Sequence, residues 1–414
     1  MTTRAPSHVD TMAGLRAVAI SLKSHIVVAF VAVVLFGILH STGGRISAGN
    51  GEGWDGQDYS RMLREGWLRG TVHTRLRPLI VWANTPVFIA TRSPVLSFVI
   101  MNLVYAGLLA GVLSMLLQRY GAGTFLRVIA VVCIAFSNHF RLQAFYPVLI
   151  DLGACAVIAV ALLLILDGPR WAAALACAAA MLAREYSVIL LFFGVHRDWR
   201  NHVPRRATIA TYVPAAILWI AVRIVASRAP NAEDVTSLHV LLENRYLWAD
   251  PLFAALFLYF LVAHAGGVSL LVASQPRCCV RFLTREPEWV SYTVPLIVVT
   301  AFGGADMWRY FTPLLPVVAV LFAQCFADRS RGEQYVLGVS ALALTLWTQA
   351  PFKRMDVMSY FADWFPYYIR QGLYPFSSPP PLWPDWGWRF LVVAVAFFVL
   401  LAFVRADDSP AHAG

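Results

Sequence analysis

The sequence predicts an all-α membrane protein whose helices cross the bilayer many times. Of its 414 residues, 59% are hydrophobic and only 14% are charged, with a mean hydropathy of +0.64. A soluble domain of this size has about 25% charged residues. The apolar residues fall in blocks close to the roughly 20 residues that a crossing helix needs. Lipid requires each segment to satisfy its own backbone hydrogen bonds, and the alternating polarity of a membrane β-barrel is absent, so helices are expected.

Apolar blocks predict about twelve crossings within a single integral-membrane domain, residues 1–414. The blocks cover residues 26–40, 94–117, 124–138, 148–166, 171–183, 186–195, 207–222, 252–274, 289–303, 310–327, 335–350 and 388–404. Basic residues precede the first block, so we expect an uncleaved first helix with a cytoplasmic N-terminus. An even number of crossings returns the C-terminus to the cytoplasm.

Arginines between the blocks orient this topology. Those in the connections on one side are Arg119, Arg127, Arg170, Arg197, Arg200, Arg205, Arg206, Arg277, Arg281, Arg285, Arg329 and Arg331. Positive charge accumulates on the cytoplasmic side of membrane proteins, which predicts a multi-pass protein of the inner (plasma) membrane with these connections in the cytoplasm. The same bias accounts for the net charge of +10 without nucleic acid. A basic stripe interleaved with aromatic residues, which nucleic-acid binding needs, is not visible.

The stretch 171–195 permits two topologies. It could be one helix with Arg184 and Glu185 as a buried ion pair at its centre. Alternatively, two short helices could meet at Arg184 and Glu185 on the outer side. We predict the second arrangement, because a single crossing would move the arginines at 197–206 to the outer side.

Two outer segments are long. Residues 41–93 contain the acidic signature Trp54-Asp55-Gly56-Gln57-Asp58-Tyr59, then an arginine-rich run, then a partly apolar stretch at 78–90. We expect this last stretch to form a helix along the membrane interface. Residues 351–387 are rich in aromatic residues and proline. They fit an aromatic belt at the headgroups as well as a sugar- or lipid-binding rim.

Polar residues that are hard to explain by packing converge on the outer face. They are Asp55, Gln57, Asp58, Tyr59, Arg75, Arg77, Asp151, Arg184, Glu185, Asp306 and Arg309. Helix capping could explain the aspartates, and ion pairing or lipid contact could explain the arginines. Ionisable residues at membrane depth are costly, however, and indicate function. We predict Asp55 and Asp58 as catalytic residues and the others as substrate-binding residues.

Carboxylates beside arginines point to a particular chemistry. A carboxylate can take a proton from a hydroxyl group, and arginine forks bind phosphate. This combination predicts transfer of a group from a lipid-phosphate donor to an acceptor hydroxyl at the outer leaflet.

Four short motifs carry a resemblance to a known family. Asp55-Gly56-Gln57, Arg75-Leu76-Arg77-Pro78, Ala183-Arg184-Glu185 and Arg309-Tyr310 resemble motifs of bacterial integral-membrane glycosyltransferases of the glycosyltransferase-C superfamily. Asp58 departs from the family pattern, which has an aromatic residue there. The resemblance implies a polyprenyl-phosphate-sugar donor, inversion at the anomeric carbon, and Asp55 as the general base. It also implies a glycan, lipid or protein acceptor in cell-envelope polysaccharide biosynthesis.

A cofactor and two other functions stay open at this stage. Some superfamily members use a divalent metal, Mg²⁺ or Mn²⁺, for which Asp55, Asp58 and Asp151 could supply oxygen ligands. The six cysteines predict neither a disulfide framework nor a zinc site. A transporter or flippase of a lipid-linked saccharide, or a glycan polymerase or ligase, is the alternative. Charges at one face and the absence of an evident internal repeat favour the transferase over a transporter.

Overall fold

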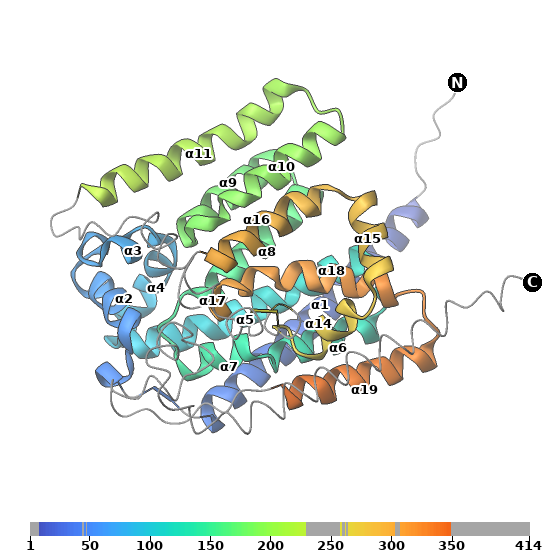
Figure 1. Cartoon of the computed structure of the whole chain (residues 1–414), viewed down its shortest axis with the longest axis horizontal. Helices are drawn as coiled ribbons and strands as arrows, with labels where there is room; N and C mark the ends of the chain where they lie inside the picture. The colour runs from blue at the N-terminus through green and yellow to red at the C-terminus, as the bar shows by residue number, and fades with distance from the viewer. Residues whose placement is uncertain are drawn as a thin grey trace, which may run out of the picture.

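The structure is a computed structural model that describes residues 8–43, 45–46, 48–228, 257–258, 261, 264–302 and 307–348. Within these ranges the regular elements are helices, as the sequence predicts, and they form one layered bundle (Figure 1). The predicted aromatic-rich segment 351–387, the apolar block 388–404, part of the block 252–274 and the candidate residue Asp306 lie outside the described residues.

Three described helices are long and apolar enough to cross a membrane. These spans are Leu22–Thr42 within α1 (His8–Thr42), α5 (Pro94–Arg119) and α11 (Arg205–Ser227). A fourth is the pair α6 (Thr124–Ala135) and α7 (Asn138–Phe145), which meet at an angle of 44°.

The predicted number of about twelve crossings is therefore not confirmed. Several predicted blocks form apolar helices that are shorter than a full crossing by length alone. These helices are α9 (Arg170–Ala183), α16 (Glu288–Phe302) and the segment Thr312–Phe326, which comprises η5 (Thr312–Leu314) and α18 (Leu315–Phe326). Another short apolar helix, α4 (Pro78–Thr91), forms where an interfacial helix was predicted. A helix of about 15 residues is only about 22 Å long, whereas the hydrocarbon core measures about 30 Å.

Helix α5 has one face in the core and one face of exposed apolar side chains. It packs against α1, α4, α18 and α8 (Asp151–Asp167). Gly107 permits the close approach of α1, because a Cβ atom there would come within 2.9 Å of the Val33 side chain. On the other face Leu96, Ile100 and Val104 are 36–54% exposed at a spacing of four residues. An apolar stripe of this kind suits lipid better than water.

Charged residues occupy the two ends of the bundle, and α8 connects these ends. Asp151 and Asp167 lie at opposite ends of this helix, which places them about 24 Å apart at 1.5 Å per residue. Near Asp167, the ion pairs are Arg119 with Asp167, Arg170 with Asp198 and Arg200 with Glu288. The ion pairs of Asp151 lie at the other end. The ion pairs of Arg119, Arg170 and Arg200 thus lie at the end of α8 opposite Asp151.

The stretch 171–195 forms two helices, as predicted. Helix α9 ends at Ala183, Arg184 is extended (φ −151°, ψ 133°), and η3 (Glu185–Val188) leads into α10 (Ile189–Arg200). Arg170, at the start of α9, pairs with Asp198, near the end of α10, at 3.0 Å. The two helices are therefore antiparallel and meet at Arg184. The single-helix alternative is wrong.

The first long segment is more helical than the sequence predicts. Its elements are η1 (Ala48–Gly51), α2 (Trp54–Glu65), η2 (Trp67–Arg69), α3 (Val72–Arg75) and α4. The helix predicted at 78–90 is α4, which begins at Pro78 because proline suits a first helical turn. The acidic signature forms the first half of α2. These elements gather at one side of the bundle (Figure 1).

Candidate active site

Two glycines, Gly56 in the acidic signature and Gly53 just before it, let α2 dock on the loop that precedes α8. The Gly56 N–H donates to the Tyr146 hydroxyl at 2.8 Å. A Cβ atom on Gly56 would come within 2.9 Å of Val148 Cβ and 3.0 Å of the Tyr146 ring. Gly53 has φ +67°, which favours glycine, and also lies against Tyr146. The contact places the first turn of α2 beside the start of α8, where Asp151 lies.

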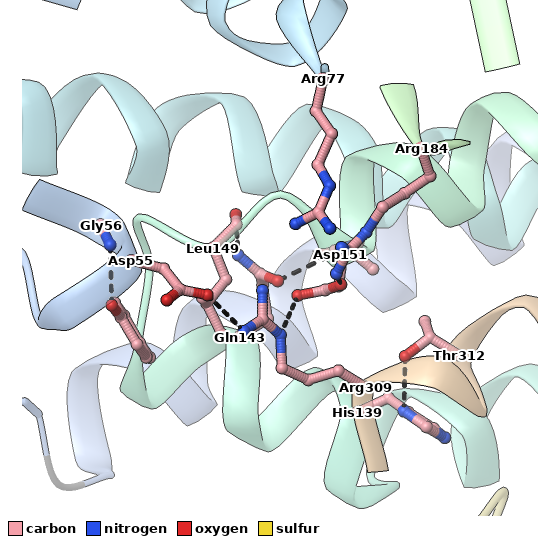
Figure 2. Close-up of polar contacts among 12 residues, drawn as sticks. Asp55, Gly56, Arg77, His139, Gln143, Leu149, Asp151, Arg184, Arg309 and Thr312 are labelled. Carbon is pink, nitrogen blue, oxygen red and sulfur yellow. Dashed lines mark hydrogen bonds and ion pairs between the residues drawn. The ribbon is translucent and has the colours of Figure 1, made fainter. Parts of the chain in front are cut away.

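Arg309 joins Asp55 and Asp151 (Figure 2). It comes from α17 (Met307–Tyr310), and its Nε donates to Asp151 Oδ2 at 2.8 Å. A second donor atom, Nη1, donates to Asp55 Oδ2 at 2.7 Å. The Asp55 side chain keeps 45% of its surface exposed, whereas those of Asp151 and Arg309 keep only 7% and 6%. Asp55 is therefore the carboxylate of this pair that an incoming molecule can reach.

Asp151 holds a second arginine on its other oxygen. Arg184 donates to Asp151 Oδ1, and both side chains are buried. The Arg184 guanidinium also lies 5.6 and 5.7 Å from the ring centroids of Tyr186 and Tyr310, which contact each other at 5.8 Å. Cation–π contacts of this kind stabilise a desolvated cation. Both Asp151 oxygens are thus engaged, and the residue positions Arg184 and Arg309.

A third arginine, Arg77, forms a bidentate ion pair with Glu185. Arg77 donates to the two carboxylate oxygens at 2.7 and 2.5 Å, and also to the Tyr59 hydroxyl at 3.2 Å. Tyr59 is fully buried in α2. The ion pair between Arg184 and Glu185 that the single-helix alternative required is absent from these contacts. The extended backbone at Arg184 directs the two neighbours to different partners.

These six ionised side chains form a neutral set, with three carboxylates and three arginines. Burial among protein atoms raises the pKa of Asp55, but the positive charges of Arg309, Arg77 and Arg184 outweigh it and leave that pKa below its ordinary value. Burial likewise opposes the ionisation of Glu185, and Arg77 outweighs it and lowers the pKa of Glu185 to about 2. Both carboxylates are therefore ionised at neutral pH.

The capping explanation for the aspartates does not hold. Gly53 and Ile150 occupy the N-cap positions of α2 and α8, and neither helix has a side-chain cap. Asp55 and Asp151 instead lie in the first turns of these helices, where the helix dipole favours a carboxylate. The helix ends thus support their negative charge while the side chains face the arginines.

Three candidate residues lie apart from this network. Asp58 pairs with Arg61 at 3.6 Å, one turn along α2, and burial raises the pKa of its carboxyl. Gln57 is exposed and its side chain lies over Gly49. Arg75 is buried and donates to the Gly70 and Ala226 carbonyl groups. These hydrogen bonds and this ion pair do not include Asp55 or Asp151, although the negative charge of Asp55 also raises the pKa of Asp58.

The structure adds residues that the sequence did not single out. The Tyr146 hydroxyl accepts a hydrogen bond from α2, and the Tyr186 ring contacts Arg184 beside Tyr310 of the Arg309-Tyr310 motif. Gln143 supports the loop before Asp151: its amide donates to the Pro147 and Leu149 carbonyl groups at 3.1 and 2.6 Å (Figure 2). A buried glutamine close to Tyr146-Pro147 was the one available signal for this support.

The described residues do not assemble the predicted metal donors. Among them, no group of three or more His, Cys, Asp or Glu side chains is placed to hold a metal ion. Asp151 is engaged by two arginines, and Asp58 does not join Asp55. We derive no step through Mg²⁺ or Mn²⁺.

Comparisons with known proteins give no family. No protein-family model, no curated protein and no solved structure matches the chain. The functional argument consequently depends on the geometry of the site.

Proposed function

We propose that the protein is a membrane glycosyltransferase that moves a sugar from a polyprenyl-phosphate donor to an acceptor hydroxyl at the outer leaflet. The observation that carries the proposal is Asp55, a reachable, ionised carboxylate held at 2.7 Å by Arg309. Around it, Arg77 and Arg184 supply further positive charge. The resemblance of the sequence motifs to glycosyltransferase-C enzymes supports the same assignment.

In this mechanism Asp55 is the general base. It accepts the proton of the acceptor hydroxyl as that oxygen attacks the anomeric carbon. The bond from the anomeric carbon to the donor phosphate oxygen breaks, and its electron pair leaves with the polyprenyl phosphate. Attack opposite the leaving group inverts the anomeric centre.

The ion pair with Arg309 couples proton transfer to departure of the phosphate. While Asp55 is ionised, one donor atom of Arg309 serves it. Protonation removes the negative charge from Asp55, so this donor atom becomes available to the phosphate as its charge develops. Asp151 keeps the other side of Arg309 in place throughout. Asp151 and Glu185 act as positioning residues for Arg309, Arg184 and Arg77.

The proposal includes a membrane placement. We place the long apolar helices α1, α5 and α11 across a bacterial inner membrane, with both termini cytoplasmic and Asp55 facing the periplasm. The exposed apolar stripe of α5 supports a membrane crossing. The arginines near Asp167 support a cytoplasmic position for that end of α8. The number of about twelve crossings stays a prediction.

The test is a transfer assay with the purified full chain in nanodiscs and a panel of radiolabelled polyprenyl-phosphate sugars. We expect one donor to be consumed and the product to have the inverted anomeric configuration, measured by NMR coupling constants. Retention of configuration would exclude the single-displacement mechanism. No consumption of any donor, together with movement of labelled lipid between leaflets, would favour the transporter alternative.

A further inference from the structure

Arg127 is a buried cation at the end of the bundle opposite Asp55. It lies in the first turn of α6, is 5% exposed, and donates to Ser24, Gln118 and Thr124 at 3.2, 3.2 and 2.9 Å. All these partners are neutral. Within the described part of the chain no carboxylate is paired with Arg127, and its Nε has no hydrogen-bond partner.

This environment differs from that of the three buried arginines in the Asp55 network. Arg77, Arg184 and Arg309 each contact at least one carboxylate. A buried charge without a counter-charge is costly, because neutral dipoles replace only part of its hydration. An anion from outside the chain would offset this cost.

A hollow of about 540 Å³ adjoins this cation. Two of its lining residues, His25 and Gln118, also contact the Arg127 guanidinium, at 3.4 and 3.2 Å. Apolar side chains line another part of it: Met115, Leu163 and Leu164. At the rim Arg119 is neutralised by Asp167. The hollow thus combines one uncompensated positive charge with an apolar wall, in the size range of ligand sites.

We propose that this hollow binds one anionic phospholipid, with its phosphate at His25 and Gln118 in the field of Arg127 and an acyl chain against the leucines. A free phosphate would use the charge but not the apolar wall. A neutral apolar ligand would leave the charge of Arg127 unmatched. In our membrane placement this end faces the cytoplasmic leaflet, where anionic headgroups accumulate. The proposal needs the membrane placement but not the sugar-transfer activity.

The test measures lipid retention by native mass spectrometry of the purified full chain, exposed in turn to phosphatidylglycerol, phosphatidylcholine and inorganic phosphate. We expect one phosphatidylglycerol to bind in preference to phosphatidylcholine. Arg127→Gln keeps hydrogen-bonding groups but removes the charge, so it should weaken binding about tenfold, as loss of one charge-assisted contact does. Arg281→Gln, at an exposed arginine, is the matched control and should bind as the wild type does.

Two further measurements keep the result interpretable if Arg127→Gln does not fold. Arg127→Lys retains the charge and should retain the preference for phosphatidylglycerol. Leu163→Trp fills the apolar wall and should reduce lipid binding without changing Arg127. Equal binding of the two lipids by the wild type would overturn the proposal. Retention of inorganic phosphate equal to that of phosphatidylglycerol would also overturn it.

Discussion

Asp55 and Arg309 are 254 residues apart in the chain and form an ion pair of 2.7 Å. Their contact joins α2, in the first long segment, to α17, which follows the last of several intervening helices. Asp151, at the start of α8, holds the other side of Arg309. The relationship leaves Asp55 reachable while its charge and direction are fixed.

Replacing Asp151 tests its role as a positioning residue. Asp151→Asn removes the counter-charge of two buried arginines, Arg184 and Arg309. Breaking a buried pair typically costs about 3–5 kcal/mol, so we expect a clearly lower thermal midpoint and a loss of activity. Asp55→Asn should lower the midpoint far less, because its side chain is 45% exposed. Equal midpoints for the two variants, measured by fluorescence thermal unfolding, would contradict this role.

Gly56 is predicted to be required for the position of Asp55. In Gly56→Ala the new Cβ atom would meet Val148 Cβ at 2.9 Å, so the first turn of α2 must shift. We expect a fall in kcat of about 100-fold, because a displacement of about 1 Å at a reacting group can cost this much. Gly123→Ala is the matched control, since no atom lies within 4 Å of its Cβ position and its φ of −66° suits alanine. Steady-state kinetics of both variants that matched the wild type would count against the docking argument.

The acid limb of the pH profile of transfer should depend on the positive charge of Arg309, because this charge lowers the pKa of Asp55. A base must be deprotonated to act, and the pKa of Asp55 lies below its ordinary value of 3.8. Protonation of Asp55 should therefore not limit the rate between about pH 5 and 7. Arg309→Gln removes a positive charge while burial persists, so the residual activity should decline at a higher pH than in the wild type. A kcat/KM profile with an unchanged acid limb would show that Arg309 does not set the pKa of the base.

The pair of Arg77 and Glu185 should contribute to stability in a defined pH range. The pKa of Glu185 is lowered from 4.5 to about 2, so its contribution is complete above pH 4.5 and is lost as the pH falls towards 2. Glu185→Gln should consequently reduce the thermal midpoint at pH 7 and have progressively less effect in acid. The comparison is a series of thermal midpoints between pH 3 and 7, with Glu65→Gln, at the exposed end of α2, as the control. A destabilisation that did not depend on pH would point to packing instead of charge.

Much of the fold could be predicted because hydropathy reports directly on helices that face lipid. The blocks at 94–117 and 207–222 correspond to α5 and α11, and the arginines at 197–206 correctly predicted the break at Arg184. The number of crossings could not be predicted in the same way. An apolar block also forms when a short helix is covered by protein, so hydropathy does not distinguish a full crossing from a helix of 14 or 15 residues such as α9 or α16.

The site was predictable in its members but not in its connections. Charge at membrane depth selected Asp55, Asp151, Arg184 and Arg309 correctly as neighbours. Their pairing depends on side-chain direction, which sequence spacing does not give. Asp58 shares α2 with Asp55 yet pairs with Arg61. The role of Tyr146 was missed, because an aromatic residue in an apolar sequence looks like ordinary core.

The central claim is that Asp55 is the general base, and the most direct test is donor consumption by Asp55→Asn beside Asp58→Asn in one assay. We expect Asp55→Asn to fold normally and to lose about 100-fold or more of the transfer rate, the usual contribution of a general base. Asp58→Asn should retain most of the rate, because Asp58 lies outside the Arg309 network. Full activity of a normally folded Asp55→Asn variant would contradict the account.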